Sequence, residues 1–97
     1  MKNIRVVMII SGKVVQGIGF RIRMADMAKK LGVGCEVMNL PGGHQVKAIL
    51  EGKEDKIKEL IKWAKKGPPG AEVEKVDIFP RPYQGDLNGH RIVVSSK

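Results

Sequence analysis

Apolar and less apolar residues alternate along the first part of the chain, from Ile4 to Gly12. The apolar residues that share one face are Ile4, Val6, Met8 and Ile10. A period of two residues places these side chains on the same side of an extended backbone, and β-branched residues, which favour strands, are frequent here. The pattern therefore predicts a first strand over residues 4–12.

The spacing of the apolar residues changes after a glycine-bearing loop at residues 16–19. They then recur at three- and four-residue intervals, which is the period of a helix with one buried face. These residues are Phe20, Met24, Met27, Ala28 and Leu31. Lys29 and Lys30 occupy the expected last turn, where cations are favourable, and a glycine such as Gly32 commonly ends a helix. We expect a helix from Phe20 to Leu31.

Two further strand-like segments, residues 34–39 and 44–51, flank a Leu-Pro-Gly-Gly sequence at residues 40–43. A glycine pair between two such segments indicates a tight connection between neighbouring antiparallel strands. We therefore expect a β-hairpin whose turn lies at residues 40–43.

A second helical pattern runs from Glu54 to Lys66. Its apolar face is formed by Ile57, Leu60, Ile61 and Ala64. Acidic residues occupy the first turn and lysines the last turn, which is the arrangement that the helix dipole favours. A Gly-Pro-Pro-Gly sequence at residues 67–70 ends the predicted helix.

The remaining chain contains one clear strand pattern and one weaker pattern. Residues 71–79 are predicted to form a strand, although their apolar residues fall out of strict alternation, which indicates a β-bulge. These apolar residues are Val73, Val76 and Ile78. The weaker pattern covers residues 90–94, and the polar, turn-rich residues 80–88 are expected to connect the two strands.

The expected elements follow the order βαββαβ, which consists of two similar halves. This order is typical of the ferredoxin-like α+β sandwich, in which an antiparallel sheet carries two helices on one face. The chain of 97 residues has the length of one ordinary domain and contains no low-complexity tract. We expect a single domain over residues 1–97, with a small active site.

The composition narrows the possible functions. Lys and Arg outnumber Asp and Glu by 18 to 10, and the net charge of +8 favours an anionic partner such as a phosphorylated metabolite, nucleic acid or an acidic surface. The single cysteine, Cys35, cannot form an intramolecular disulfide. With only His44 and His90 in addition, no spacing resembles a zinc site. We expect chemistry without a metal or other cofactor.

No segment has the pattern of a membrane span or a signal peptide. The longest uninterrupted apolar run, residues 6–10, is far too short to cross a bilayer, and the N-terminus lacks a longer apolar stretch followed by a cleavage site. We expect a cytoplasmic protein without a membrane partner, and a monomer.

The segment with the clearest candidate chemistry is Gly-Ile-Gly-Phe-Arg at residues 17–21, where a glycine loop leads into a helix. The N-terminus of a helix offers free N–H groups and a partial positive charge to an oxyanion. Arg21 adds a planar fork that can bind two phosphate oxygens. Taken alone, however, a short glycine loop before a helix is more often a plain structural turn.

Three blocks of the sequence resemble the acylphosphatase family. Residues 12–21, Gly-Lys-Val-Val-Gln-Gly-Ile-Gly-Phe-Arg, are similar to its signature, commonly Gly-x-Val-Gln-Gly-Val-x-Phe-Arg. Residues 31–41 resemble a second motif, with an asparagine, here Asn39, before the hairpin. Residues 63–76 resemble the family's second helix and the strand after it. The blocks keep the family's order, and the likeness covers about residues 4–94.

The resemblance implies a ferredoxin-like hydrolase that cleaves the carboxyl–phosphate bond of a small acyl phosphate and releases a carboxylate and inorganic phosphate. It implies that Arg21 binds the phosphate and that Asn39 orients the attacking water, a role that the residues alone do not indicate, because such an asparagine more often bonds its own backbone. The implied phosphate-binding loop comprises Gln16, Gly17, Ile18, Gly19, Phe20 and Arg21.

The chain departs from the family pattern near the predicted site. One extra residue lies between Gly12 and Gln16, which predicts a bulge in the first strand, and a second falls near His44. Other positions carry residues that are unusual for the family. They are Cys35, Glu36, Gly42 and His90. Because some of these changes lie close to Asn39, a degenerate relative that binds an anion without turnover is an alternative.

A second alternative is an RNA-binding module, since RNA-recognition domains share this order of strands and helices and the chain is basic. Such domains stack bases on aromatic side chains of the sheet. The aromatic residues here form no such run, and two lie outside the predicted strands. They are Phe20, Trp63, Phe79 and Tyr83. The sequence therefore favours a small-molecule phosphate site over a nucleic-acid surface.

Overall fold

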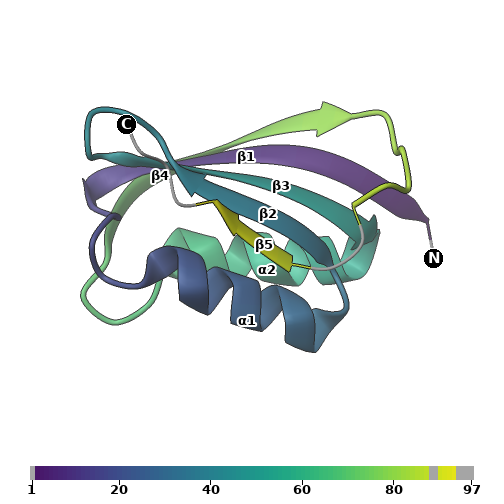
Figure 1. The fold of residues 1–97 in the computed structure, drawn as a ribbon, viewed down its shortest axis with the longest axis horizontal. Helices are drawn as coiled ribbons and strands as arrows, with labels where there is room; N and C mark the ends of the chain where they lie inside the picture. The colour runs from purple at the N-terminus through teal and green to yellow at the C-terminus, as the bar shows by residue number, and fades with distance from the viewer. Residues whose placement is uncertain (1, 88–89, 94–97) are drawn as a thin grey trace.

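A computed structural model describes residues 2–87 and 90–93 of the protein. Its elements follow the predicted order (Figure 1): β1 (Asn3–Val14), α1 (Phe20–Leu31), β2 (Gly34–Asn39), β3 (Gln45–Lys53), α2 (Glu54–Lys66), β4 (Glu72–Arg81) and β5 (His90–Val93). Both predicted helices have the expected bounds. No helix among the described residues is long and apolar enough to span a membrane.

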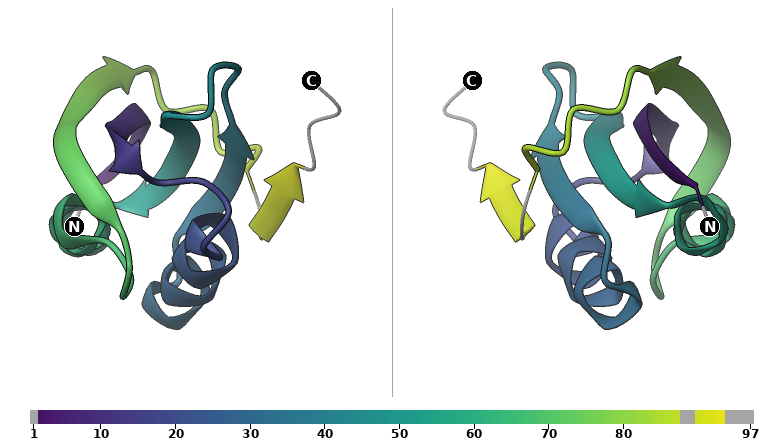
Figure 2. Two further views of the ribbon diagram at one scale, coloured as in Figure 1. Left: turned by 90° about the vertical axis from the view of Figure 1, so that its left-hand side faces the viewer. Right: turned by 90° about the vertical axis from the view of Figure 1, so that its right-hand side faces the viewer.

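The strands form one sheet in the order β4-β1-β3-β2-β5. β1 pairs antiparallel with β3 and β4, and β3 pairs antiparallel with β2. Both helices lie on the same face of the sheet, as Figure 2 shows from two sides. The predicted ferredoxin-like sandwich is therefore confirmed. β5 adds an edge strand that runs parallel to β2, an orientation that the sequence did not indicate.

Three strands have boundaries that differ from the prediction. β1 spans Asn3–Val14 instead of residues 4–12. β3 begins one residue later than expected and continues to Lys53. β4 spans Glu72–Arg81, so that Pro80, expected in a loop, pairs with Val6. Proline lacks an N–H donor and is tolerated here because β4 lies at an edge of the sheet. The last residue of the strand predicted over 90–94 lies outside the described residues.

Both predicted bulges occur, and they face each other between β1 and β4. The pairing passes from Ser11↔Lys75 to Gly12↔Val73 and then to Val14↔Glu72. β4 therefore has one unpaired residue between the first two pairs, and β1 has one between the last two. The two offsets cancel, so the register is restored. The bulge in β4 explains why Val73 packs against the core together with Val76 and Ile78 despite the broken alternation.

The core lies between the helices and the sheet, and both layers supply apolar side chains to it. Its largest fully buried side chains are Phe20, Met8, Ile10, Met24, Leu50, Ile57, Leu60, Val15, Val33, Val37, Val46 and Cys35. At one end of this core, the ring of Phe20 packs edge-on against Trp63, with 5.6 Å between the ring centroids. This contact joins the first residue of α1 to α2 and so helps to orient the start of α1.

A buried carboxylate holds the chain after β4 against the sheet. Glu51 of β3 is 4% exposed. It accepts hydrogen bonds from the backbone N–H groups of Gln84, Gly85 and Leu87, at 2.8, 3.1 and 3.1 Å. Arg5 of β1 completes the cluster with an ion pair of 3.1 Å to Glu51. The sequence analysis did not identify this cluster, because its members lie far apart along the chain.

Candidate functional site

The loop between β1 and α1 ends in a helix N-terminus without a side-chain cap. Gly19 is the N-cap residue, with φ 79° and ψ 18°, and no side chain bonds to the first turn. Gly17 also has a positive φ, of 77°. A Cβ at either glycine would meet no atom within 4 Å, so the left-handed backbone rather than lack of space favours glycine. This loop shape exposes the start of α1 without a competing cap.

The first turn of α1 combines the partial positive charge of the helix with Arg21. The turn contains no acidic residue. The first N–H groups of a helix have no intrahelical acceptor, and Arg23 N is the donor of the bond to Gly19 O, at 3.0 Å. Arg21 is half-buried, one position after the buried Phe20. These features suit an oxyanion, because the uncapped N–H groups and Arg21 belong to one helix turn that contains no acidic residue.

Asn39 is the last residue of β2, which ends beside the start of α1. β1 and β2 both run toward the same end of the molecule and α1 runs away from it, so the glycine loop, Arg21 and Asn39 belong to one end (Figure 1). Within the described part of the chain, Oδ1 of Asn39 is buried and has no hydrogen-bond partner. A buried acceptor is rarely left unpaired in a native protein, and a bound water is one way to satisfy it.

Gln16 has a role that the sequence did not indicate. Its Nε2 donates to Leu40 O and to Gln45 O, at 2.8 Å in both cases. The side chain of Gln16 thus joins the glycine loop to the hairpin rather than projecting toward an anion at the helix start. Its backbone N–H remains the group through which Gln16 can contribute to an oxyanion site.

Cysteine and histidine are common nucleophiles and bases in enzymes, but the structure supports neither role for Cys35 or His44. Burial, with a smaller contribution from Glu36, raises the pKa of the Cys35 thiol to about 12, so the reactive thiolate is scarce at neutral pH. His44 is exposed in the hairpin turn. The side chain of His90 lies outside what the structure describes. Across residues 2–87 and 90–93, no cluster of three His, Cys, Asp or Glu side chains could hold a metal ion.

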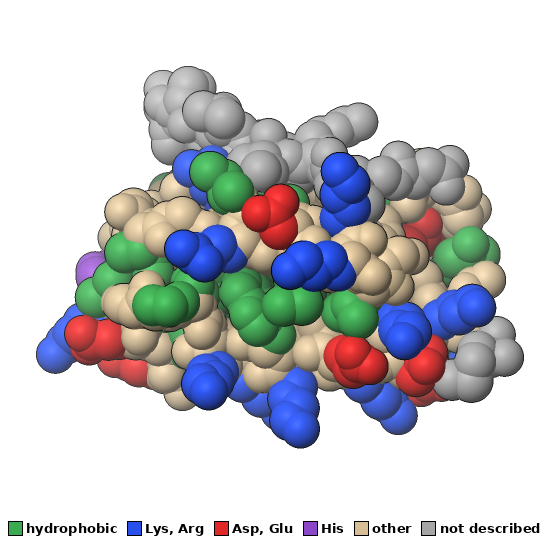
Figure 3. All heavy atoms as spheres, turned by 90° about the horizontal axis from the view of Figure 1, so that it is seen from below, with side chains coloured by type: hydrophobic (Ala, Val, Ile, Leu, Met, Phe, Trp, Pro, Cys, Tyr) green, Lys and Arg blue, Asp and Glu red, His purple; other side chains and the backbone are tan. Residues whose placement is uncertain are grey.

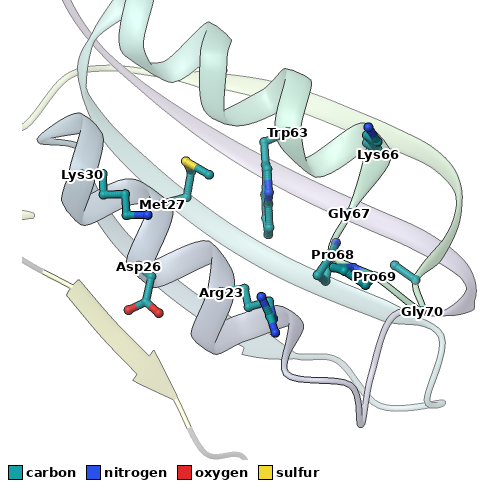
Figure 4. Close-up of a pocket in the computed structure, with 11 residues that line it drawn as sticks. Arg23, Asp26, Met27, Lys30, Trp63, Lys66, Gly67, Pro68, Pro69 and Gly70 are labelled. Atoms are coloured by element: carbon teal, nitrogen blue, oxygen red, sulfur yellow. The ribbon is translucent and has the colours of Figure 1, made fainter.

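The helical face carries a groove between α1 and α2, which is separate from this site. Its lining combines apolar side chains with cations (Figures 3 and 4): Arg23, Asp26, Met27, Lys30, Trp63, Lys66 and residues 67–71. Figure 4 shows Trp63 standing between the helices, with Arg23 near the turn that follows α2. None of residues 16–21 lines the groove, and neither does Asn39. Its cations are therefore distinct from Arg21.

Comparison with known proteins relates the chain to one family. The family model described as Acylphosphatase matches residues 6–92. A curated acylphosphatase of Pyrobaculum islandicum is 43% identical over 93 residues, which cover 96% of this chain and 97% of that protein. A second, of Caldivirga maquilingensis, is 45% identical over 92 residues, covering 93% and 94%. The solved acylphosphatase of Coxiella burnetii matches with a TM-score of 0.86 and 30% identity, covering 94% and 93% of the two chains.

Proposed function

Because the chain belongs to the acylphosphatase family, we propose that its active site is the loop from Gln16 to Arg21 together with Asn39. The chain is an acyl-phosphate hydrolase. It cleaves the carboxyl–phosphate bond of an acyl phosphate and yields a carboxylate and inorganic phosphate. The loop, the start of α1 and the end of β2 are the segments that carry out this reaction.

The phosphate binds at the start of α1. Backbone N–H groups of the loop and first turn donate to its oxygens, and the guanidinium of Arg21 forms charge-assisted bonds to two of them. Because these donors are positioned before the substrate arrives, they stabilise the negative charge that develops as the phosphorus–oxygen bond breaks. The first turn of α1 contains no acidic residue that would repel a bound phosphate.

Asn39 holds the attacking water. Its Oδ1 accepts a hydrogen bond from the water, while its Nδ2 can donate to an oxygen of the phosphate or of the water. The water oxygen forms the new bond to phosphorus, the bond to the acyl oxygen breaks, and the carboxylate leaves with the electron pair. The water proton passes to a phosphate oxygen. No side-chain base is needed, because a carboxylate is a good leaving group, and positioning supplies most of the acceleration.

The observation that carries these roles is the buried, unpartnered Oδ1 of Asn39 at the same end of the fold as the uncapped helix start. The alternatives are not favoured. Among the described residues, the exposed large aromatic side chains are Phe79 and Tyr83, and only Phe79 lies in a strand. A sheet that stacks RNA bases needs more than one such platform. The acylphosphatases that match nearly the whole chain favour turnover over anion binding alone.

The proposal also covers the cofactor requirement, the oligomeric state, the location and the size of the substrate. The enzyme works without a metal or other cofactor, since the proposed chemistry uses only backbone donors, Arg21 and Asn39. It acts as a monomeric single domain in the cytoplasm on a small-molecule acyl phosphate. The strongly basic composition suits this anionic substrate.

Hydrolysis of acetyl phosphate and benzoyl phosphate by purified Arg21→Ala protein tests the assignment. Loss of the guanidinium should lower kcat/KM by about 100-fold or more, which is the effect of removing one donor to a developing oxyanion. Inhibition by inorganic phosphate should weaken as well. Arg23→Ala is the matched control, since Arg23 is exposed and lines the groove between the helices.

The Arg23→Ala protein should retain activity within a few-fold of the wild type. Equal effects of the two arginine substitutions would contradict the role of Arg21, because they would indicate a general contribution of surface charge. The same assay after exhaustive treatment with EDTA should give unchanged rates. A large loss that zinc or magnesium restores would overturn the metal-free mechanism.

A further inference from the structure

Four hydrogen bonds join residues 11–16 to the mouth of the β2–β3 hairpin. These residues comprise the end of β1 and the chain up to the first residue of the phosphate loop. Gly12 N donates to His44 O at 3.1 Å, and Gln45 Nε2 donates to Ser11 Oγ at 3.1 Å. The other two bonds come from the side chain of Gln16 and end on Leu40 O and Gln45 O. Gln16 therefore supplies half of these hydrogen bonds with a single amide group, and it is itself the first residue of the proposed phosphate loop.

The two acceptors of Gln16 lie next to Asn39 and next to its partner across the hairpin. Leu40 follows Asn39 directly, and Gln45 precedes Val46, which pairs with Asn39. Leu40 N also donates to Gln45 O at 3.0 Å, so the amide of Gln16 binds at the pair that closes the hairpin. A displacement of Gln16 relative to this pair would move the end of β2, and the backbone of Asn39 with it.

Only an amide fits this arrangement. One nitrogen with two hydrogens donates to two carbonyl oxygens at the same distance, 2.8 Å. A carboxylate of the same shape would bring two acceptors toward two acceptors, and an apolar side chain would leave partly buried carbonyl groups without this donor. Because both hydrogens of Nε2 are used, this nitrogen is not available to bind phosphate.

We infer that Gln16 is a positioning residue for the hydrolysis of acyl phosphates: its amide fixes the distance between the phosphate loop and Asn39. This inference rests on the proposed function of Arg21 and Asn39. The loop holds the phosphorus and Asn39 holds the water, so the reaction requires the two segments to keep one separation. Displacements of about 1 Å at such a site can reduce the rate by as much as 100-fold.

A double-mutant cycle between Gln16 and Asn39 tests this inference. The kcat, the KM for benzoyl phosphate and the inhibition constant of inorganic phosphate are measured for wild type, Gln16→Met, Asn39→Ala and the double variant. Gln16→Met should lower kcat by about 10-fold or more while changing phosphate inhibition only a few-fold, because the loop N–H groups and Arg21 are retained and no charge is added. In the background of Asn39→Ala, the same substitution should change kcat by less than about 3-fold, since interacting residues are not additive.

Ser11→Ala is the matched control, because it removes the neighbouring bond from Gln45 and leaves the amide of Gln16 in place. It should keep kcat within a few-fold of the wild type. Thermal unfolding of each variant verifies folding, and Gln16→Leu, which also lacks donors and charge, replaces Gln16→Met if the latter does not fold.

Three results would overturn the inference, and they differ in what they imply for the proposed function. If Asn39→Ala lowers kcat and the effects of the two substitutions multiply, Gln16 does not act through Asn39, although the proposed function stands. If Asn39→Ala leaves kcat unchanged, the water-positioning role fails and the inference about Gln16 fails with it. A Gln16→Met effect confined to phosphate inhibition would also refute positioning, because it would make Gln16 a binding residue.

Discussion

Asn39 is the residue at which binding and turnover can be separated. Arg21 and the helix N–H groups can bind phosphate whether or not a water is held nearby, whereas Asn39 has a buried oxygen without a partner among the described residues. Its carboxamide both accepts and donates without carrying a charge. A group of this kind orders a nucleophile and leaves the electrostatic attraction for phosphate to its neighbours.

Replacement of Asn39 by alanine should therefore lower kcat by about 100-fold or more, the range expected when a positioning group is lost. The inhibition constant for inorganic phosphate should change only a few-fold, because the interaction is made mainly in the transition state. Steady-state kinetics with benzoyl phosphate and phosphate as inhibitor measure both quantities. Asn3→Ala, at an exposed asparagine at the start of β1, is the control. Unchanged kcat with a collapse of phosphate inhibition would make Asn39 a binding residue.

The paired bulges of β1 and β4 position the strand that leads into the phosphate loop. Gly12 lies between the two offsets and is buried. An ideal Cβ on Gly12 would lie 2.0 Å from Glu72 O and 2.9 Å from Val73 Cα, both of which are backbone atoms. Since backbone atoms cannot rotate out of the way, any side chain at this position would separate the two strands. The extra residue in β1 is accommodated because Gly12 allows this close approach.

Gly12→Ala should lower the free energy of unfolding by about 2 kcal/mol or more, as overpacking of a close contact does. Urea denaturation followed by circular dichroism measures this change. The substitution should also lower kcat, because Gly12 N bonds to the hairpin at His44 O. Lys13→Ala, at the exposed neighbouring residue, should leave both quantities close to the wild type. Equal stability of the two variants would show that the bulges tolerate a side chain.

In the whole molecule, the proposed active site lies at one end, and a buried charge cluster lies in the cross-over from one sheet edge to the other. The chain leaves β4 at one edge and re-enters the sheet as β5 at the opposite edge. Burial alone would raise the pKa of Glu51, but the N–H groups of Gln84, Gly85 and Leu87 and the guanidinium of Arg5 outweigh it and lower the pKa to about 2. The cluster thus favours the ionised carboxylate in the folded state.

The pH dependence follows from the direction of this shift. The pKa of Glu51 is lower in the folded chain than its ordinary value of 4.5, so the unfolded chain binds the proton more readily. The stabilisation is therefore fully present above about pH 4.5 and is lost as the pH falls toward about 2. At neutral pH the carboxylate is charged in both states, and the hydrogen bonds of the folded state contribute in full.

Glu51→Gln should lower the free energy of unfolding at pH 7 by about 2 kcal/mol, since it removes a charged acceptor from several buried donors. It should also make the stability less dependent on pH between about 4.5 and 2. Urea denaturation at a series of pH values measures both effects. Glu59→Gln, at an exposed position of α2, is the control. A pH dependence that is the same in both variants would contradict the role of Glu51.

The sequence alone predicted the order of helices and strands and indicated the family. The helices and strands were recognised from local features, namely the spacing of apolar residues, the charges at the ends of α2 that suit the helix dipole, and the glycine turns. Such features do not depend on contacts between distant residues, and both helices had the expected bounds. The loop at residues 16–21 was recognised because its signature is contiguous. Asn39 was found through the resemblance alone, because an asparagine before a hairpin has no local signal for catalysis.

The contacts between residues that lie far apart in the sequence are seen only in the tertiary structure. The amide of Gln16 reaches carbonyl groups 24 and 29 residues away, and Glu51 binds N–H groups 33 to 36 residues away. The parallel pairing of β5 with β2 likewise depends on a cross-over between sheet edges. These contacts leave no pattern in the sequence, because the residues that form them become neighbours only when the sheet assembles. For that reason the sequence predicted the proposed phosphate loop, whereas the bonds that hold this loop against the hairpin could be found only in the folded chain.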